Sequence, residues 1–220
     1  MLVYHFVPAG HGLENINKRR LKIATIPELN DPFELLCADL ADPVIRERLK
    51  NWKLKMGAKF GLLCFSKTWK NPVQWSHYAD RHRGLALGFE VESQFVREVD
   101  YSSKRSKAEA RELLTSSKTS PQLAMTFAST KFAHWRYEQE VRAFVELKDI
   151  DRDPDSTLYF YKFGDRFRLK EVLVGSESTV SRADITNALG PLSESVVTRK
   201  VRLAFSTYRV VAQKDQKLWK

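Results

Sequence analysis

The chain has 220 residues, 43% of them hydrophobic and 29% charged, which is a globular composition and long enough to bury a core without disulfide staples. It has no apolar run of about 18 residues and no signal-peptide pattern, so we expect a cytoplasmic protein with no membrane partner. Cys37 and Cys64 are too few and too far apart for a disulfide framework. The net charge of +10 makes nucleic acid a reasonable partner, while the oligomeric state has no sequence signal.

Hydrophobic periodicity predicts the elements of the first third of the chain. In order, they are a strand at 2–7, a helix at 13–20, a strand at 21–25, a helix at 43–56 and a strand at 60–66. The segment from Ile26 to Glu34 contains two prolines and an Asn-Asp pair, which specify a rigid turn rather than a regular element.

The middle third of the chain is predicted to contain three helical segments and two strands. We expect one or two helical turns at 72–79, strands at 84–90 and 96–101, a helix at 108–114 and a longer helix from Pro121 to Trp135. Residues 102–120 are rich in Ser, Lys and Thr, so we expect a mobile polar insertion there. The buried side of the longer helix is expected to be Leu123, Phe127, Ala128, Phe132 and Trp135.

The last third predicts mainly strands. In order, we expect a strand at 138–147, an acidic turn at 149–155, strands at 158–163, 167–169 and 171–175, a helix at 181–189, and strands at 196–203 and 206–212. Strands outnumber helices and are joined irregularly. The predicted fold class is therefore α+β, a single domain over residues 1–220 with a mixed or mainly antiparallel sheet and flanking helices.

Two carboxylates, those of Glu138 and Glu140, lie two positions apart at the start of the strand predicted at 138–147. Alternation places Glu138, Glu140 and Arg142 on one face of that strand, with Val141 and Ala143 on the other. Two such glutamates shift each other's pKa unless a cation lies between them. The arrangement suits general acid–base catalysis, metal binding or a hydrogen bond to a sugar hydroxyl. Taken alone, the pattern is more typical of a solvated strand face with a surface pair of Glu140 and Arg142.

Two further segments make the pattern more specific. They are Leu29-Asn30-Asp31-Pro32-Phe33-Glu34 and Trp75-Ser76-His77-Tyr78-Ala79. Together with Trp135 to Arg142, they resemble a bacterial and phage family described only as domain of unknown function 2971, over nearly the whole chain. Relatives often carry Lys in place of His5, which weakens any role for that residue. We interpret the 29–34 segment as a wall of the same cleft, with Asp31 or Glu34 contacting Arg142 or a ligand hydroxyl.

The layout also looks like that of mono-ADP-ribosyltransferases. That resemblance implies an early strand that meets NAD, a central polar or aromatic position against nicotinamide, and a late catalytic Glu, often as Glu-x-Glu. The matching positions are Tyr4 and His5, then Ser66 or Tyr78, then Glu138 and Glu140. The full set expected to bind NAD is Tyr4, His5, Asn30, Asp31, Phe33, Glu34, Ser66, Trp75, Tyr78, Trp135 and Arg142.

The chemistry assigns separate duties to the two glutamates. Breaking the bond from nicotinamide to ribose develops positive charge on the sugar, which the carboxylate of Glu140 would stabilise. Glu138 would orient or deprotonate the acceptor. Trp75, Tyr78 or Trp135 would supply an aromatic wall, although such residues are more often core. The predicted function is transfer of ADP-ribose to nucleic acid or protein, or NAD cleavage, in a toxin or phage-defence effector.

Two alternatives stay open. One is a metal-dependent nuclease in which Asp31, Glu34, Glu138 and Glu140 hold magnesium or manganese. The other is a non-catalytic module whose basic surface binds nucleic acid. A zinc site is not expected, because His77 and His82, with Asp80 between them, lack a third ligand at useful spacing.

Overall fold

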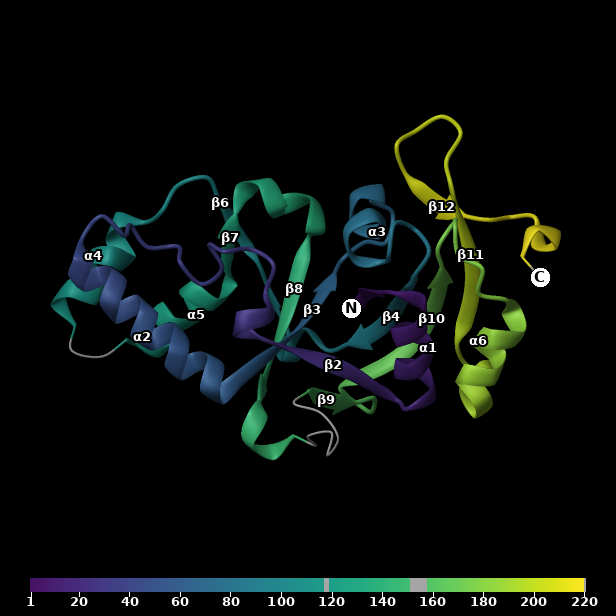
Figure 1. Cartoon of the computed structure of the whole chain (residues 1–220), viewed down its shortest axis with the longest axis horizontal. Helices are drawn as coiled ribbons and strands as arrows, with labels where there is room; N and C mark the ends of the chain where they lie inside the picture. The colour runs from purple at the N-terminus through teal and green to yellow at the C-terminus, as the bar shows by residue number, and fades with distance from the viewer. Residues whose placement is uncertain (117–118, 151–157, 220) are drawn as a thin grey trace.

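Among the residues that this computed structural model describes, ten strands form one large sheet and two more pair with each other, and a helical lobe lies at one end of the molecule. The structure describes residues 1–116, 119–150 and 158–219. Figure 1 shows α2, α4 and α5 gathered at one end and β11, β12 and α6 at the other. The strands are β1 Leu2–Val7, β2 Arg20–Thr25, β3 Phe60–Ser66, β4 Leu85–Val91, β5 Arg97–Glu98, β6 Asp100–Ser102, β7 Thr130–Phe132, β8 Glu140–Glu146, β9 Tyr159–Lys162, β10 Phe167–Val174, β11 Val197–Leu203 and β12 Val210–Ala212.

Three of the helices begin where the sequence supplies a capping side chain followed by proline. The helices are α1 Ala9–Asn17, α2 Pro43–Lys59, α3 Pro72–Tyr78, α4 Lys107–Thr115, α5 Pro121–Ser129 and α6 Arg182–Leu189. Asp42, Asn71 and Ser120 each accept a backbone N–H in the first turn of α2, α3 and α5, and each precedes a proline at the first helical position. None of the described helices is both long and apolar enough to cross a membrane.

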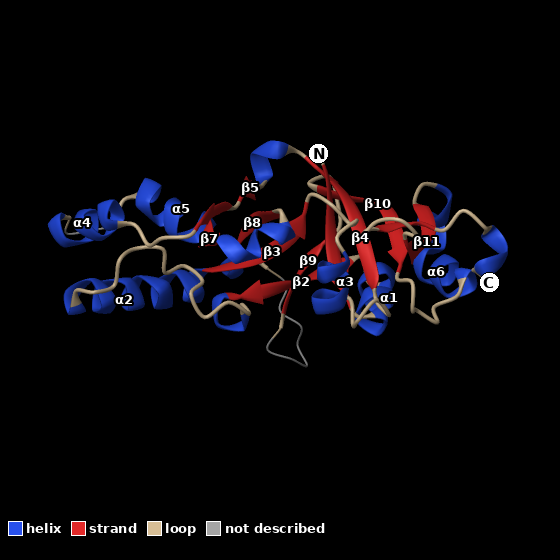
Figure 2. Ribbon diagram, turned by 90° about the horizontal axis from the view of Figure 1, so that it is seen from above, coloured by secondary structure: helices blue, strands red, loops and turns tan. Residues whose placement is uncertain are grey.

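The sheet is mixed and divides beside β3. Its order is β12-β11-β10-β4-β1-β3-β2-β9, and β8 pairs along β3 and carries β5 on its other side. All of these pairings are antiparallel except β10 with β11. Within the described residues β1 meets β3 at one register pair, Tyr4 opposite Ser66, whereas Ala24 and Thr25 of β2 take the other end of β3. The two strands therefore separate. Figure 2 shows the strands in the middle of the molecule, with α2, α4 and α5 at one end and α6 at the other. The predicted α+β domain with a mixed sheet is confirmed.

Apolar residues form a core on each face of the sheet and a third under the helical lobe. Val141, Ala143 and Val145 of β8 lie in the largest cluster, as their alternation predicts. Tyr4 and Trp75 lie in a second cluster with Val201 and Val210. The lobe cluster joins α2, α4 and α5 and is Ala38, Ile45, Leu49, Ala110, Leu113, Leu123 and Phe127.

The predicted helix from Pro121 to Trp135 is wrong in its second half. Helix α5 ends at Ser129, and the chain then forms β7 and a 3-10 helix at Ala133–Glu138. The hydroxyls of Ser129 and Thr130 donate to carbonyls four residues back, at 2.8 and 2.7 Å, which offers the last turn an alternative to continued helix. Strand pairing with β6 then holds the next residues, so the predicted inward Phe132 is 38% exposed.

Smaller differences have local causes. The helix predicted at 13–20 lies at 9–17, and its Gly12 packs so closely against Leu85 that a Cβ there would lie 2.7 Å from Leu85 Cδ1. The strand predicted at 96–101 is broken into β5 and β6. The two strands predicted at 167–169 and 171–175 form one strand, β10, with a bulge after Leu169. Residues 117–118 of the predicted mobile insertion and 151–155 of the predicted acidic turn lie outside the described residues.

Candidate functional site

Strand register brings the first predicted site residues into one row. Tyr4 of β1 lies opposite Ser66 of β3, and Ser66 lies opposite Glu140 of β8. Where β1 and β3 separate, a cavity of about 220 Å³ opens. Its lining is Tyr4, His5, Phe6, Glu28, Leu29, Asn30, Glu34, Cys64, Phe65, Ser66, Gln74, Tyr78, Lys131, Glu138, Glu140 and Arg142.

Arg142 is the buried anchor of the site. Its Nε donates to Glu140 Oε1 at 2.7 Å and its Nη2 to Glu140 Oε2 at 3.0 Å, a bidentate pair. Nη1 donates to the Ala128 carbonyl at 2.8 Å, and Nη2 also donates to the carboxylate of Glu34. Arg142 is 1% exposed and Glu140 is 6% exposed. The solvated surface pair that the sequence pattern alone favours is therefore wrong, because the second face of β8 is covered by the 29–34 segment and by α5.

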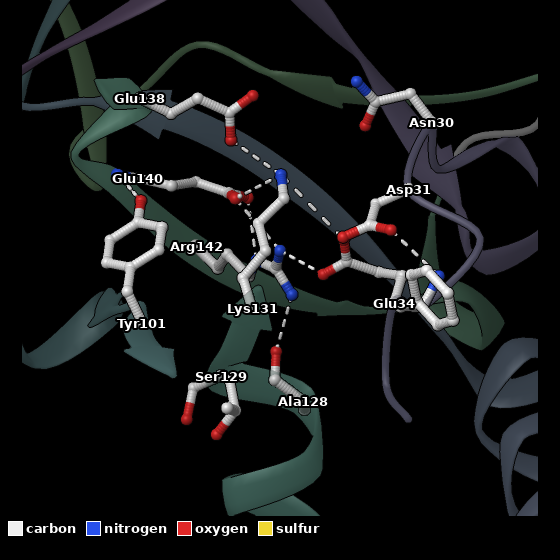
Figure 3. A network of polar contacts seen from close by, with 12 residues as sticks. Asn30, Asp31, Glu34, Tyr101, Ala128, Ser129, Lys131, Glu138, Glu140 and Arg142 are labelled. Atoms are coloured by element: carbon white, nitrogen blue, oxygen red, sulfur yellow. Dashed lines mark hydrogen bonds and ion pairs between the residues drawn. The ribbon is translucent and has the colours of Figure 1, made fainter. Parts of the chain in front are cut away.

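Lys131 holds the carboxylates together, and the sequence interpretation missed it. Its Nζ lies 2.6 Å from Glu138, 3.1 Å from Glu140 and 3.9 Å from Glu34. Figure 3 shows this ammonium between the three carboxylates. The erroneous helix through 121–135 hid the residue, because it placed Lys131 on a helix surface. The available signal was the pair of hydroxyl residues Ser129 and Thr130 before it, which can end a helix.

Glu138 and Glu140 belong to different elements of secondary structure. Glu138 ends the 3-10 helix rather than starting β8, and Gln139 after it has a left-handed backbone with φ 45°. The predicted strand alternation from Glu138 is therefore wrong, yet both carboxylates face Lys131. Tyr78 of α3 donates its hydroxyl to Glu138, and Asn30 Nδ2 donates to that hydroxyl at 2.7 Å.

The two glutamates have oppositely shifted pKa values. Burial raises the pKa of Glu138, and this effect outweighs the opposing pull of Lys131 and Tyr78. Burial also acts to raise the pKa of Glu140, but Arg142 and Lys131 overcome it and lower that pKa to about 2. Glu140 is thus ionised across the physiological range, whereas Glu138 is the carboxyl that is easier to protonate. Such a split pair is a common arrangement for acid–base work.

Gln74 is a second residue that the sequence interpretation missed. It is 2% exposed, and its Nε2 donates to Ser66 Oγ at 2.8 Å and to the Glu138 carbonyl at 2.7 Å. Ser66 in turn donates to the Thr68 carbonyl, so its oxygen must accept from Gln74, which fixes the amide orientation. Gln74 Oε1 is then a buried acceptor with no partner among the described residues. A buried acceptor of this kind is costly unless something donates to it.

His5 and Tyr4 line the cavity from β1. His5 Nδ1 lies 3.0 Å from the Cys64 carbonyl, which can only accept, so Nδ1 carries the proton and Nε2 is an acceptor. Burial lowers the pKa of His5, so the ring is neutral near pH 7. Burial and the neighbouring Glu171 raise the pKa of Tyr4 to about 12, which keeps its hydroxyl protonated.

Four residues predicted to bind NAD lie away from this cavity. Asp31 Oδ1 accepts from the Phe33 amide at 2.9 Å, so that carboxylate closes the turn. Trp75 is fully buried and donates to the Trp69 carbonyl at 2.6 Å. Trp135 packs over Lys131 from outside the lining, 4.8 Å from Nζ to the ring centre. Phe33 is 55% exposed and lies beneath Arg105 in a neighbouring cavity. The remaining predicted residues do come together, including Glu34 against Arg142.

The geometry gives little support to a metal site. In the described part of the chain, no group of three His, Cys, Asp or Glu side chains is placed to hold a metal ion. Glu34, Glu138 and Glu140 do converge, but the ammonium of Lys131 already occupies the position between them. A divalent cation would have to displace that charge, and electrostatic repulsion opposes the exchange.

Comparison with known proteins adds one match. No curated protein and no solved structure matches the chain. Residues 74–143 match the family described as Protein of unknown function (DUF2971), which confirms the resemblance for the segments Trp75–Ala79 and Trp135–Arg142. The segment 29–34 lies outside the match.

Proposed function

We propose that the protein is an NAD-using enzyme that transfers ADP-ribose to an acceptor or cleaves the dinucleotide. The observation that carries the proposal is the split pair, Glu138 and Glu140, facing one cavity with pKa values shifted in opposite directions. In this proposal the protein works in the cytoplasm, as a toxin or a phage-defence effector.

The charge balance of the network suits a reaction that develops positive charge. Three carboxylates, of Glu34, Glu138 and Glu140, surround two cations, Lys131 and Arg142. When all five groups are ionised, the network carries one net negative charge. As the bond from ribose to nicotinamide breaks and its electron pair leaves with nicotinamide, positive charge grows on the sugar. A fixed negative charge on buried side chains stabilises that state more than it stabilises the neutral starting sugar.

Proton transfer falls to Glu138. An acceptor hydroxyl or amine must lose a proton as it bonds to the sugar carbon, and a carboxylate with a raised pKa takes that proton more readily than Glu140 does. Tyr78 and Lys131 hold the Glu138 carboxylate in place. Glu140, bound on both oxygens by Arg142, supplies constant charge instead.

The size and lining of the cavity fit the reacting end of the dinucleotide. Drug-sized ligands occupy pockets of roughly 300–1,000 Å³, so a cavity of about 220 Å³ would enclose a nicotinamide and part of its ribose and leave the remainder outside. Tyr78 provides an aromatic wall. The unpartnered Oε1 of Gln74 would accept a hydrogen bond from the carboxamide N–H of nicotinamide.

Release of nicotinamide from labelled NAD tests the proposal. We expect the native protein to release it and Glu138→Gln to reduce the rate by about 100-fold or more, the range for a lost proton-transfer group. The same substitution at the exposed Glu98, which pairs with Lys67 on the surface, is the matched control and should leave the rate unchanged. No nicotinamide release from the native protein, with acceptors of both classes present, would refute the assignment. Nucleic acid cleavage that a chelator abolishes would instead identify the nuclease.

A further inference from the structure

The loop between β11 and β12 exposes two aromatic rings almost completely. Phe205 is 94% exposed and Tyr208 is 99% exposed, and the next most exposed large hydrophobic residue among those described is Leu218, at 65%. Figure 1 shows the loop projecting beyond the sheet. Rings this exposed gain almost none of the stabilisation that burial gives a large apolar side chain, so they do not serve the packing of this chain.

The backbone holds both rings on a short, defined tip. Ala204 donates its amide to the Arg209 carbonyl at 2.9 Å, which continues the pairing of β11 with β12 to the base of the loop. The tip is therefore Phe205-Ser206-Thr207-Tyr208, with an aromatic residue at each end and small hydroxyl residues between. Below it, Val210 donates to the Lys70 carbonyl at 2.9 Å, which anchors the hairpin beside the segment that leads into α3.

Cations accompany the rings. The Arg202 guanidinium lies 4.3 Å from the centre of the Phe205 ring, and Arg209 is exposed directly after Tyr208. In the described part of the chain, neither arginine is paired with a carboxylate at salt-bridge distance. Exposed Lys70 and Arg199 lie in the segments beside the hairpin base, and the chain carries a net charge of +10. Aromatic faces next to unpaired cations are the combination that single-stranded nucleic acids meet in their binding proteins, where bases stack and phosphates are neutralised.

We propose that this hairpin tip is a stacking surface for single-stranded nucleic acid. Phe205 and Tyr208 would each stack on a base, and Arg202 and Arg209 would contact the flanking phosphates. Val201 and Val210, one on each β-strand of the hairpin, pack in the cluster that contains Tyr4 and Trp75. A nucleic acid bound at the tip would therefore lie on the same part of the molecule as β1, which lines the cavity. The inference rests on the exposure and charge of the hairpin and does not depend on NAD chemistry.

The residues at the tip favour nucleic acid over a membrane as the ligand. A hairpin that inserts into lipid would need apolar residues along its tip, whereas this tip carries Ser206 and Thr207 between its two rings. A duplex would hide its base faces from the rings and would bind only through phosphates. We therefore expect a preference for single strands over duplexes of the same length.

Fluorescence anisotropy with a labelled oligothymidine, and with a duplex and anionic phospholipid vesicles for comparison, tests the proposal on the full chain. The native protein should bind the single strand, and the double variant Phe205→Ala, Tyr208→Ala should bind about tenfold more weakly or worse for each ring. Leu218→Ala, which removes an exposed side chain outside the hairpin, is the control and should bind as the native protein does. Because both rings are exposed, the melting temperature should not change.

A second pair of variants separates stacking from charge. Phe205→Trp should retain or strengthen binding, and Arg202→Gln should reduce the slope of log affinity against log salt by about 0.7 for the lost phosphate contact. The proposal is overturned if the double alanine variant binds the oligonucleotide as well as the native protein does. It is also overturned if the native protein binds only the vesicles, or binds duplex and single strand equally through the same residues.

Discussion

The ammonium of Lys131, on β7, donates at 2.6 Å to the carboxylate of Glu138, seven residues later at the end of a 3-10 helix, and both side chains are buried. This contact closes a network that runs from Asn30 at the surface, through Tyr78 and Glu138, to Arg142 in the interior. Buried ion pairs contribute little net stability, because the desolvation of both ions offsets their attraction. A network of this extent is therefore better explained by what it does at the cavity than by folding.

Removal of Lys131 should destabilise the protein strongly. Lys131→Met leaves three buried carboxylates with Arg142 as their remaining neutralising cation, and the loss of one partner from a buried pair costs about 3–5 kcal/mol. Urea denaturation at pH 7 measures the free energy of unfolding. Lys67→Met, which breaks the exposed pair with Glu98, should cost less than about 1 kcal/mol. Equal losses at the two positions would contradict the buried network.

Glu140 should make the protein sensitive to acid. Its pKa is about 2 in the folded protein, below its ordinary value of 4.5. A lowered folded pKa contributes stability that is present above pH 4.5 and is lost as the pH falls through 2, in total about 3 kcal/mol. Glu140→Gln should flatten the dependence of unfolding free energy on pH in this window. Glu146→Gln, at an exposed pair with Lys59, should leave the dependence intact.

Glu138 should set the acidic limb of the pH–rate profile, and Tyr78 should shift it. The pKa of Glu138 is raised by burial, and a proton acceptor works only when it is deprotonated, so nicotinamide release should fall as the pH drops through that raised value. Tyr78→Phe removes a donor that favours the charged carboxylate. The limb should therefore move to higher pH, while the fold is retained because the ring remains. A limb that stays in place would show that Glu138 is not the titrating group.

Gly84 should not tolerate a side chain. A Cβ there would lie 2.2 Å from the Val7 carbonyl oxygen and 2.9 Å from Ala79 Cα, which are backbone atoms that cannot rotate away. Gly84→Ala should destabilise the protein by more than the ~1–3 kcal/mol typical of overpacking. Gly164→Ala, where nothing lies within 4 Å, should be neutral or stabilising by up to ~1 kcal/mol. Thermal melts of the two variants make the comparison.

Elements with strong local signals could be placed from the amino-acid sequence. Strands β1 and β3 have the predicted bounds, and the capped helix at Pro72 begins as expected, because alternation, continuous apolar runs and Asx-Pro caps act within a few residues. The sequence also singled out Glu34, Tyr78, Glu138, Glu140 and Arg142, because they lie in the three segments that carry the family resemblance, and all five line the cavity.

Which of these residues meet depends on contacts between segments that are far apart in the chain. Lys131 joined the site because Ser129 and Thr130 end α5 and strand pairing then turns the chain inward, an outcome that helical periodicity alone does not reveal. Asp31 and Trp75 left the predicted site because a turn amide and a core carbonyl are their nearest partners. The cavity itself exists because β1 leaves β3 after the pair of Tyr4 with Ser66, and the separation of two strands depends on contacts between segments far apart in the chain.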